Sequence, residues 1–232
     1  MAGLMYILEG LTSVFGQMLV PGMLVVSSDA AATATNILAS DSLFRLGIAS
    51  GLLAVAFHIA QTVLFYVLFR PVSRVFALML ASFSLVAIGL QAVSILFQLA
   101  PLVVLGGARD LGAFNAEQLQ ALSLLFLKWR GQAYNVYLVF FGFRCVLLGY
   151  LIYRSTFMPR VIGGLMALAG VGYLMLLWPP LVNRVSPFNL ALAAPGELSF
   201  VFWLLVYGVR SQQWLQLADA AESSGRKSPQ KE

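Results

Sequence analysis

The chain of 232 residues is 60% hydrophobic and only 10% charged, whereas charged residues make up roughly 25% of an ordinary soluble domain. This composition excludes a water-soluble globular fold and favours a protein embedded in a lipid bilayer. The net charge of +5 comes from basic residues placed between apolar runs and near the C-terminus, a pattern that orients spans rather than binding nucleic acid.

The first apolar run, residues 4–26, begins the predicted membrane region. It has no basic segment before it and no convincing cleavage signature of small residues, so we expect a retained span rather than a signal peptide. Asp29 follows it directly and precedes an alanine-rich segment. An aspartate in this place is a favourable N-cap, which predicts a short helix after it.

Spans of about 20 apolar residues recur along the whole chain. Asn115, with Gln118 three residues later, forms a capping-box pattern before a further amphipathic helix, which we place at the membrane interface. The predicted spans are residues 4–26, 47–69, 75–99, 132–153, 161–178 and 188–209, the last interrupted at Pro195 and Gly196.

The expected fold class is all-α: a polytopic bundle of six transmembrane helices with two short outer interfacial helices. Residues 1–214 form one membrane domain in this prediction. The polar residues 215–232 form a disordered cytoplasmic tail, because they contain too little apolar surface to pack.

The basic residues of the loops predict the orientation. They are retained on the cytoplasmic side, and eight of them follow the second, fourth and sixth spans, against five elsewhere. Both termini are therefore expected in the cytoplasm of a bacterium, with the protein in its inner membrane.

Arg144 lies near the middle of the fourth span, so other groups must compensate the cost of its buried positive charge. A guanidinium at the centre of a bilayer costs at least ~2.5 kcal/mol, and Glu9 is the carboxylate within the spans that we expect to neutralise it. The hypothesis is an interior polar cluster or ligand site, whose members are Glu9, Gln17, His58, Gln61, Tyr137 and Arg144.

The same residues also permit a purely structural interpretation. Glu9 and Arg144 then fix helix register, while His58 and Gln61 bond between helices. Gln91, Ser94 and Gln98 share one face of the third span and either line a pore mouth or form hydrogen bonds between helices. On the fourth span, a face with Gly142, Cys145 and Gly149 allows a neighbouring helix to approach closely.

No recognisable catalytic or cofactor-binding set is present in the sequence. One histidine and one cysteine cannot supply a haem, a histidine-rich metal site or a disulfide. The motifs of zinc proteases, serine hydrolases and phosphate-binding loops are absent. We therefore expect neither a metal nor a cofactor, and the sequence favours a protein that is not an enzyme.

Four segments together resemble a bacterial integral-membrane family catalogued as domain of unknown function 4386. The resemblance covers residues 4–210 and implies a six-span protein of the bacterial cytoplasmic membrane, without an established activity. The segments are DAAATATNILASDSLFRLGI, LFRPVSRVFALM, EQLQALSLLFLK and VFFGFRCVLLGYLIYRSTFMPRVIGGLMALAGVGYL.

Two functions from different classes remain open at this point. The first is a non-catalytic component that binds a ligand, senses a signal or assists assembly, and the second is a small transporter or channel for a proton or an anionic solute. The expected partners are the lipid bilayer, a small ligand or lipid, and another membrane protein or a second copy of the chain.

Overall fold

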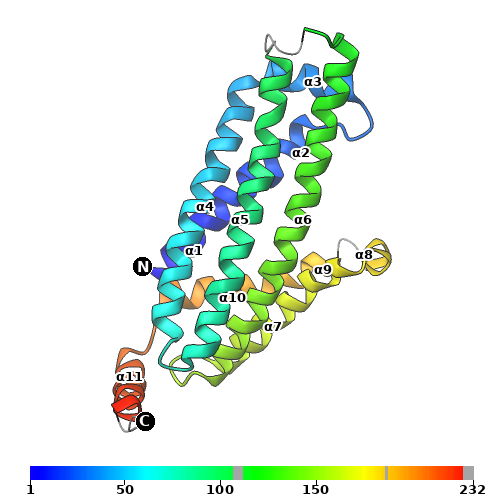
Figure 1. The fold of residues 1–232 in the computed structure, drawn as a ribbon. Helices are drawn as coiled ribbons and strands as arrows, with labels where there is room; N and C mark the ends of the chain where they lie inside the picture. The colour runs from blue at the N-terminus through cyan, green and yellow to red at the C-terminus, as the bar shows by residue number, and fades with distance from the viewer. Residues whose placement is uncertain (107–111, 186–187, 227–232) are drawn as a thin grey trace, which may run out of the picture. The chain divides into compact units, whose positions relative to one another are not determined.

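The computed structural model describes residues 1–106, 112–185 and 188–226, and all regular elements in this part of the chain are helical (Figure 1). The all-α prediction is thus confirmed. The elements are α1 (Ala2–Ser13), a π-helical segment η1 (Val14–Leu19), α2 (Val20–Leu24), α3 (Ala30–Ala39), α4 (Asp41–Phe69), α5 (Arg74–Leu105), α6 (Ala116–Arg154), α7 (Arg160–Leu174), a 3₁₀ segment η3 (Met175–Leu177), α8 (Pro179–Val185), α9 (Phe188–Ala191), α10 (Ala193–Val206) and α11 (Ser211–Arg226).

Five helical stretches in the described residues are long and apolar enough to cross a membrane. The predicted sixth span is instead divided into α9 and α10. With 14 residues, α10 reaches only ~21 Å, against a hydrocarbon layer of ~30 Å. Pro195 lies in the first turn of α10, where a proline is tolerated, so the break falls before this residue and not at it. The five spanning stretches are Ala2–Leu24, Asp41–Phe69, Arg74–Leu105, Ala116–Arg154 and Arg160–Leu177.

The capping box at the start of α6 is confirmed. The Asn115 N–H donates to Gln118 Oε1, and the Gln118 N–H donates to Asn115 Oδ1, both at 2.9 Å. However, the predicted interfacial helix and fourth span are one continuous helix of 39 residues. The two apolar runs are joined by Lys128, Trp129, Arg130 and Gly131, and Gly131 alone among them disfavours a helix strongly; a single glycine costs about 1 kcal/mol without ending a helix. The Asp29 cap is also present, because its carboxylate accepts from the Ala32 N–H at 2.9 Å.

The helix α11 extends to Arg226 and so covers the first part of residues 215–232, whose assignment as a separate cytoplasmic tail stays a prediction. Trp214, Leu217 and Ala218 are partly buried at helical spacing, which gives this segment an apolar stripe despite its polar composition. The indole N–H of Trp214 donates to the carbonyl of Leu68 at 2.9 Å. Residues 227–232 of the predicted tail lie outside the described residues.

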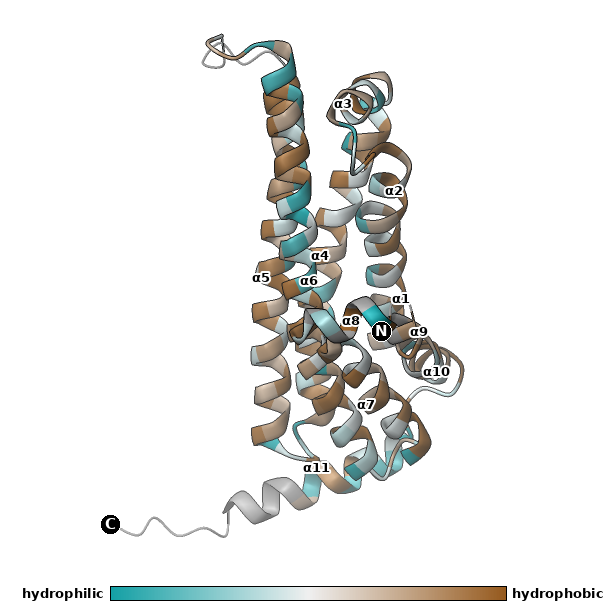
Figure 2. Ribbon diagram, turned by 90° about the vertical axis from the view of Figure 1, so that its right-hand side faces the viewer, coloured by the Kyte–Doolittle hydropathy of each residue, from teal (hydrophilic) through white to brown (hydrophobic). Residues whose placement is uncertain are grey.

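Apolar side chains cover the outside of the long helices, while polar side chains are buried. Along α5, for example, Leu85 and Leu96 are exposed, whereas Gln91 and Gln98 are fully enclosed. Brown, hydrophobic residues dominate α5 in Figure 2. This arrangement suits a hydrocarbon solvent, in which apolar surface is stable and each polar group requires a partner inside the protein.

The chain forms two compact units. The Arg130 unit contains Met5–Ile59 and Ala87–Tyr137, and the Arg144 unit contains Met1–Leu4, Ala60–Val86 and Leu138–Glu232. The single domain expected over residues 1–214 stays a prediction. The core of the Arg130 unit consists of Val20, Leu24, Ile37, Phe44, Ile48, Ile95 and Leu127.

Glycines bring helices into direct backbone contact in both units. In the Arg130 unit, a Cβ at Gly16 would lie 2.5 Å from the Gly47 carbonyl oxygen and 2.7 Å from the Gly51 nitrogen. In the Arg144 unit, a Cβ at Gly149 would lie 2.6 Å from the carbonyl oxygen of Gly163. The predicted small-residue face of the fourth span therefore does contact a neighbouring helix, α7.

Replacing Gly16 with alanine tests this contact. The new methyl group must displace backbone atoms of α4, so we expect Gly16→Ala to lower the free energy of unfolding by about 1–3 kcal/mol. Thermal unfolding in detergent measures the change. Gly10→Ala is the matched control, because it has open space and alanine favours the helix. Equal melting temperatures for the two variants would contradict the contact.

Candidate functional site

Arg130 on α6 is the centre of a polar network inside the Arg130 unit. Its side chain is only 9% exposed. Nε donates to Gln98 Oε1 at 3.1 Å, while Nη2 donates to the backbone carbonyl of Gln17 and to Gln17 Oε1, the latter at 3.2 Å. All of these acceptors are neutral, so the buried guanidinium keeps a positive charge that no carboxylate offsets in this network.

Pro21 explains why backbone carbonyls of the first span are available to these donors. A proline has no N–H, so Pro21 cannot donate to Gln17, its α-helical acceptor, or to Gly16, its π-helical acceptor. Side chains from other helices donate instead. Arg130 reaches the Gln17 carbonyl, and Gln98 Nε2 donates to the Gly16 carbonyl at 3.2 Å.

The polar face of α5 completes the network. Ser94 Oγ donates to the backbone carbonyl of Arg130 at 3.3 Å and to Gln17 Oε1 at 3.5 Å. One turn away, Gln91 Oε1 lies 3.4 Å from His58 Nδ1. Of the two interpretations of Gln91, Ser94 and Gln98, hydrogen bonding between helices is therefore confirmed.

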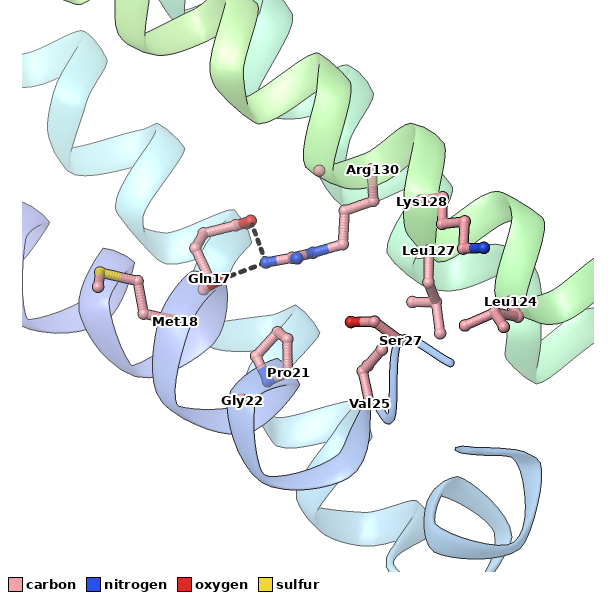
Figure 3. A pocket seen from close by; sticks show the side chains of 11 residues that line it. Gln17, Met18, Pro21, Gly22, Val25, Ser27, Leu124, Leu127, Lys128 and Arg130 are labelled. Carbon is pink, nitrogen blue, oxygen red and sulfur yellow. Dashed lines mark hydrogen bonds between the residues drawn. The ribbon is translucent and has the colours of Figure 1, made fainter. Parts of the chain in front are cut away.

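A cavity of about 380 Å³ adjoins Arg130. Figure 3 shows the Arg130 side chain extending from α6 toward Gln17 on the first span. The cavity is lined by Gln17, Met18, Pro21, Gly22, Val25, Ser27, Leu124, Leu127, Lys128, Arg130 and Gly131. None of these lining residues is acidic, and Lys128 adds a second cation, so the cavity suits an anion.

One nitrogen of Arg130 is left for such an anion. Within the described residues Nη1 forms no hydrogen bond, whereas Nε and Nη2 both donate to the protein. An arginine presents its donors as a planar fork that matches the geometry of carboxylate and phosphate oxygens.

Arg144 lies in a different environment, inside the Arg144 unit. Its side chain is fully buried, and Nη2 donates to Gln61 Oε1 at 2.5 Å. The guanidinium carbon lies 4.7 Å from the ring centre of Phe141 and 5.5 Å from that of Phe65. Cation–π contacts of this kind stabilise a desolvated arginine by about 2 kcal/mol.

A carboxylate of the same unit also acts on Arg144. Glu197 on α10 interacts with it electrostatically, and Tyr173 donates its hydroxyl to Glu197 Oε1 at 2.6 Å. From the sequence, Glu9 is the carboxylate expected beside Arg144. α10 packs closely against α7, since a Cβ at Gly196 would lie 2.5 Å from the Leu165 carbonyl, and this packing brings Glu197 into the cluster.

The six residues of the predicted cluster are divided between the two units. Gln61 and Arg144 belong to the Arg144 unit and bond to each other, whereas the other four belong to the Arg130 unit. There His58 contacts the ring of Tyr137 at 6.4 Å between centroids, and Gln17 bonds to Arg130. Glu9 is buried in the same unit, and its expected pairing with Arg144 stays a prediction.

Arg130 is a functional candidate that the sequence does not single out, because it lies between a predicted interfacial helix and the fourth span, where a basic residue indicates a loop. One signal was present: a proline four residues after Gln17 predicts an available carbonyl in the first span. The partner of that carbonyl lies 113 residues away in the chain and could not be found from local pattern.

No metal centre is formed in the part of the chain that the structure describes. No group of three histidine, cysteine, aspartate or glutamate side chains there lies close enough together to hold an ion.

The apolar spanning helices and the enclosed polar groups together define a helical membrane protein. The chain belongs to the family described as Domain of unknown function (DUF4386), whose model matches residues 1–208. An uncharacterized protein of Archaeoglobus fulgidus is 26% identical to it over 159 residues, which cover 67% of this chain and 80% of the relative. No solved structure matches the chain.

Replacing Arg130 with lysine tests the network. A lysine keeps the charge but cannot reach Gln98 and Gln17 with separate nitrogens, so we expect Arg130→Lys to lower the free energy of unfolding by about 1–3 kcal/mol. Thermal unfolding in detergent again measures this change in stability. Arg74→Lys, at an exposed position on α5, is the control and should change nothing. Equal stability of Arg130→Lys and the unaltered protein would refute the role of the fork.

Proposed function

We propose that the protein is a non-catalytic ligand-binding component of the membrane, and that it binds an oxyanion, a carboxylate or a phosphate, in the cavity beside Arg130. The observation that supports this most directly is a buried guanidinium that faces a cavity and bonds only to neutral groups. Burial strengthens the attraction of that charge for an anion, because the dielectric constant is lower there than in water.

The arrangement also explains how specificity arises. Gln17 and Gln98 hold two nitrogens of the guanidinium, so the third points in a defined direction without a further entropic cost. Lys128 at the exposed rim supplies long-range attraction and a second donor. Apolar walls exclude water from the anion once it is bound.

Titration with phosphate and acetate tests the proposal. In neutral detergent at constant ionic strength, we expect both to raise the melting temperature of the unaltered protein, because a ligand that binds only the folded state stabilises it. Arg130→Gln should weaken the affinity at least tenfold, or about 1.4 kcal/mol. Lys128→Gln, which changes an exposed side chain, should weaken it several-fold without affecting the fold.

Arg74→Gln is the matched control and should bind as the unaltered protein does, because this exposed residue is remote in sequence from the cavity-lining segments. If Arg130→Gln and Lys128→Gln both retain the full affinity for the two anions, the proposed site is wrong. Chloride at the same ionic strength distinguishes oxyanion binding from general screening.

Transport is a second candidate, favoured by the polar groups of the Arg144 unit. Glu197, Tyr173 and Arg144 form a set of buried or partly buried groups that a proton or an anion can use within the membrane. This alternative predicts flux in proteoliposomes that falls at least tenfold in Glu197→Gln. No flux, beside a working control carrier in the same vesicles, excludes transport and leaves ligand binding intact.

We further propose that the protein lies in the bacterial cytoplasmic membrane as a six-helix bundle, with both termini in the cytoplasm. The support is the distribution of basic residues and the apolar character of α10. In this arrangement α10 is the sixth, shorter membrane helix. The N-termini of α3 and α6 then lie outside the cytoplasm.

A further inference from the structure

We infer that the oxyanion in the Arg130 cavity is the phosphate headgroup of an anionic lipid, whose acyl chain leaves the cavity along its apolar wall. This inference rests on the proposed function, because it names the class of molecule that carries the anion. Three observations support it: the depth of the cavity, the division of its lining into polar and apolar parts, and its size.

The depth follows from the length of α6. With 39 residues and a rise of ~1.5 Å per residue, α6 is about 58 Å long, nearly twice the ~30 Å thickness of the hydrocarbon layer. About 20 residues span this layer, and Arg130 precedes Arg154 by more than that number, so we assign Arg130 to the membrane interface. The neighbouring Trp129 is 51% exposed, and exposed tryptophans are enriched at this level. Lipid phosphates occupy the same layer.

The cavity lining has a polar part and an apolar part, as the binding of an amphiphilic molecule requires. Arg130, Lys128 and the hydroxyl residue Ser27 supply the polar part, while the apolar part comes from Met18, Pro21, Val25, Leu124 and Leu127. Met18 is 57% exposed, and its neighbour Leu19 is exposed as well. The apolar wall is therefore continuous with the lipid-facing surface of the first span, which gives an acyl chain a path into the bilayer.

The volume of the cavity limits how much of a lipid molecule it can enclose. Ligand cavities usually occupy ~300–1,000 Å³, and about 380 Å³ holds a phosphate with its first carbon atoms but not two complete acyl chains. The remainder of the chain must lie outside, in the bilayer. Two cations at one site favour a phosphate over a singly charged carboxylate.

A series of four probes, which differ in headgroup and in the presence of an acyl chain, separates this inference from the proposed function. The probes are inorganic phosphate, glycerol phosphate, a lysophosphatidic acid with a 14-carbon chain, and a lysophosphatidylcholine with the same chain. Binding is measured in neutral detergent by native mass spectrometry and thermal shift. We expect the lysophosphatidic acid to bind at least tenfold more tightly than glycerol phosphate and than the choline lipid, and to lose this advantage in Arg130→Gln.

Met18→Asn tests the path of the acyl chain. It should weaken the binding of the lysophosphatidic acid several-fold, and by a clearly larger factor than the binding of inorganic phosphate. Met23→Asn is the matched control, because Met23 is also exposed on the first span but does not line the cavity.

Failure of the lipid inference and failure of the proposed function would give different experimental results. Equal, Arg130-dependent affinity for glycerol phosphate and lysophosphatidic acid would overturn the lipid inference while the proposed function stands. Equal affinity for the two lipids would overturn it too, because the chain alone would then account for binding. Anion binding that is unchanged by both Arg130→Gln and Lys128→Gln would remove the proposed function itself.

Discussion

The structure depends on one constraint: a polar group inside a membrane protein has no water to bond to and must find its partner within the chain. Two arginines of α6 satisfy this constraint in different ways. Arg144 is fully enclosed, bonds to Gln61 and stacks against Phe141 and Phe65, with Glu197 acting electrostatically in the same unit. Arg130 bonds to two glutamines and to a backbone carbonyl. The surroundings of Arg144 include a carboxylate that offsets its charge, whereas the neutral partners of Arg130 only solvate its charge. Arg130 is for this reason the stronger candidate for binding an anion.

The solvation of Arg130 requires an irregular first span. In a regular helix each interior carbonyl group already accepts a backbone N–H, so a carbonyl group that lacks this donor is the more favourable acceptor for a neighbouring side chain. Pro21 and the π-helical segment Val14–Leu19 change this locally, and the carbonyls of Gly16 and Gln17 accept from α5 and α6. The glycine contact between Gly16 and α4 holds the irregular segment at close range. π-Helical segments inside longer helices occur frequently at functional sites, and this one lines the cavity.

Structural features that depend on residues close together in the chain were predicted correctly from the sequence. The caps at Asp29 and Asn115 are present because each joins atoms three residues apart. The interhelical role of Gln91, Ser94 and Gln98 also agreed with one of the two stated interpretations. One prediction was inaccurate where the local signal was weak. Gly131 does not end a helix, so the interfacial helix and the fourth span expected on either side of it are the single helix α6.

The sequence by itself determined the helical class, the apolar character of the spans, the helix caps and the family, because each follows from composition or from residues close together in the chain. The tertiary structure decided which polar groups meet. Arg130 and Gln17 are 113 residues apart, and Arg144 and Gln61 are 83 residues apart. Helix periodicity places each of these side chains on a face but does not say which helix that face contacts. Close packing through glycine helps to select the neighbours, and the resulting fold makes Arg130 the centre of a buried polar network.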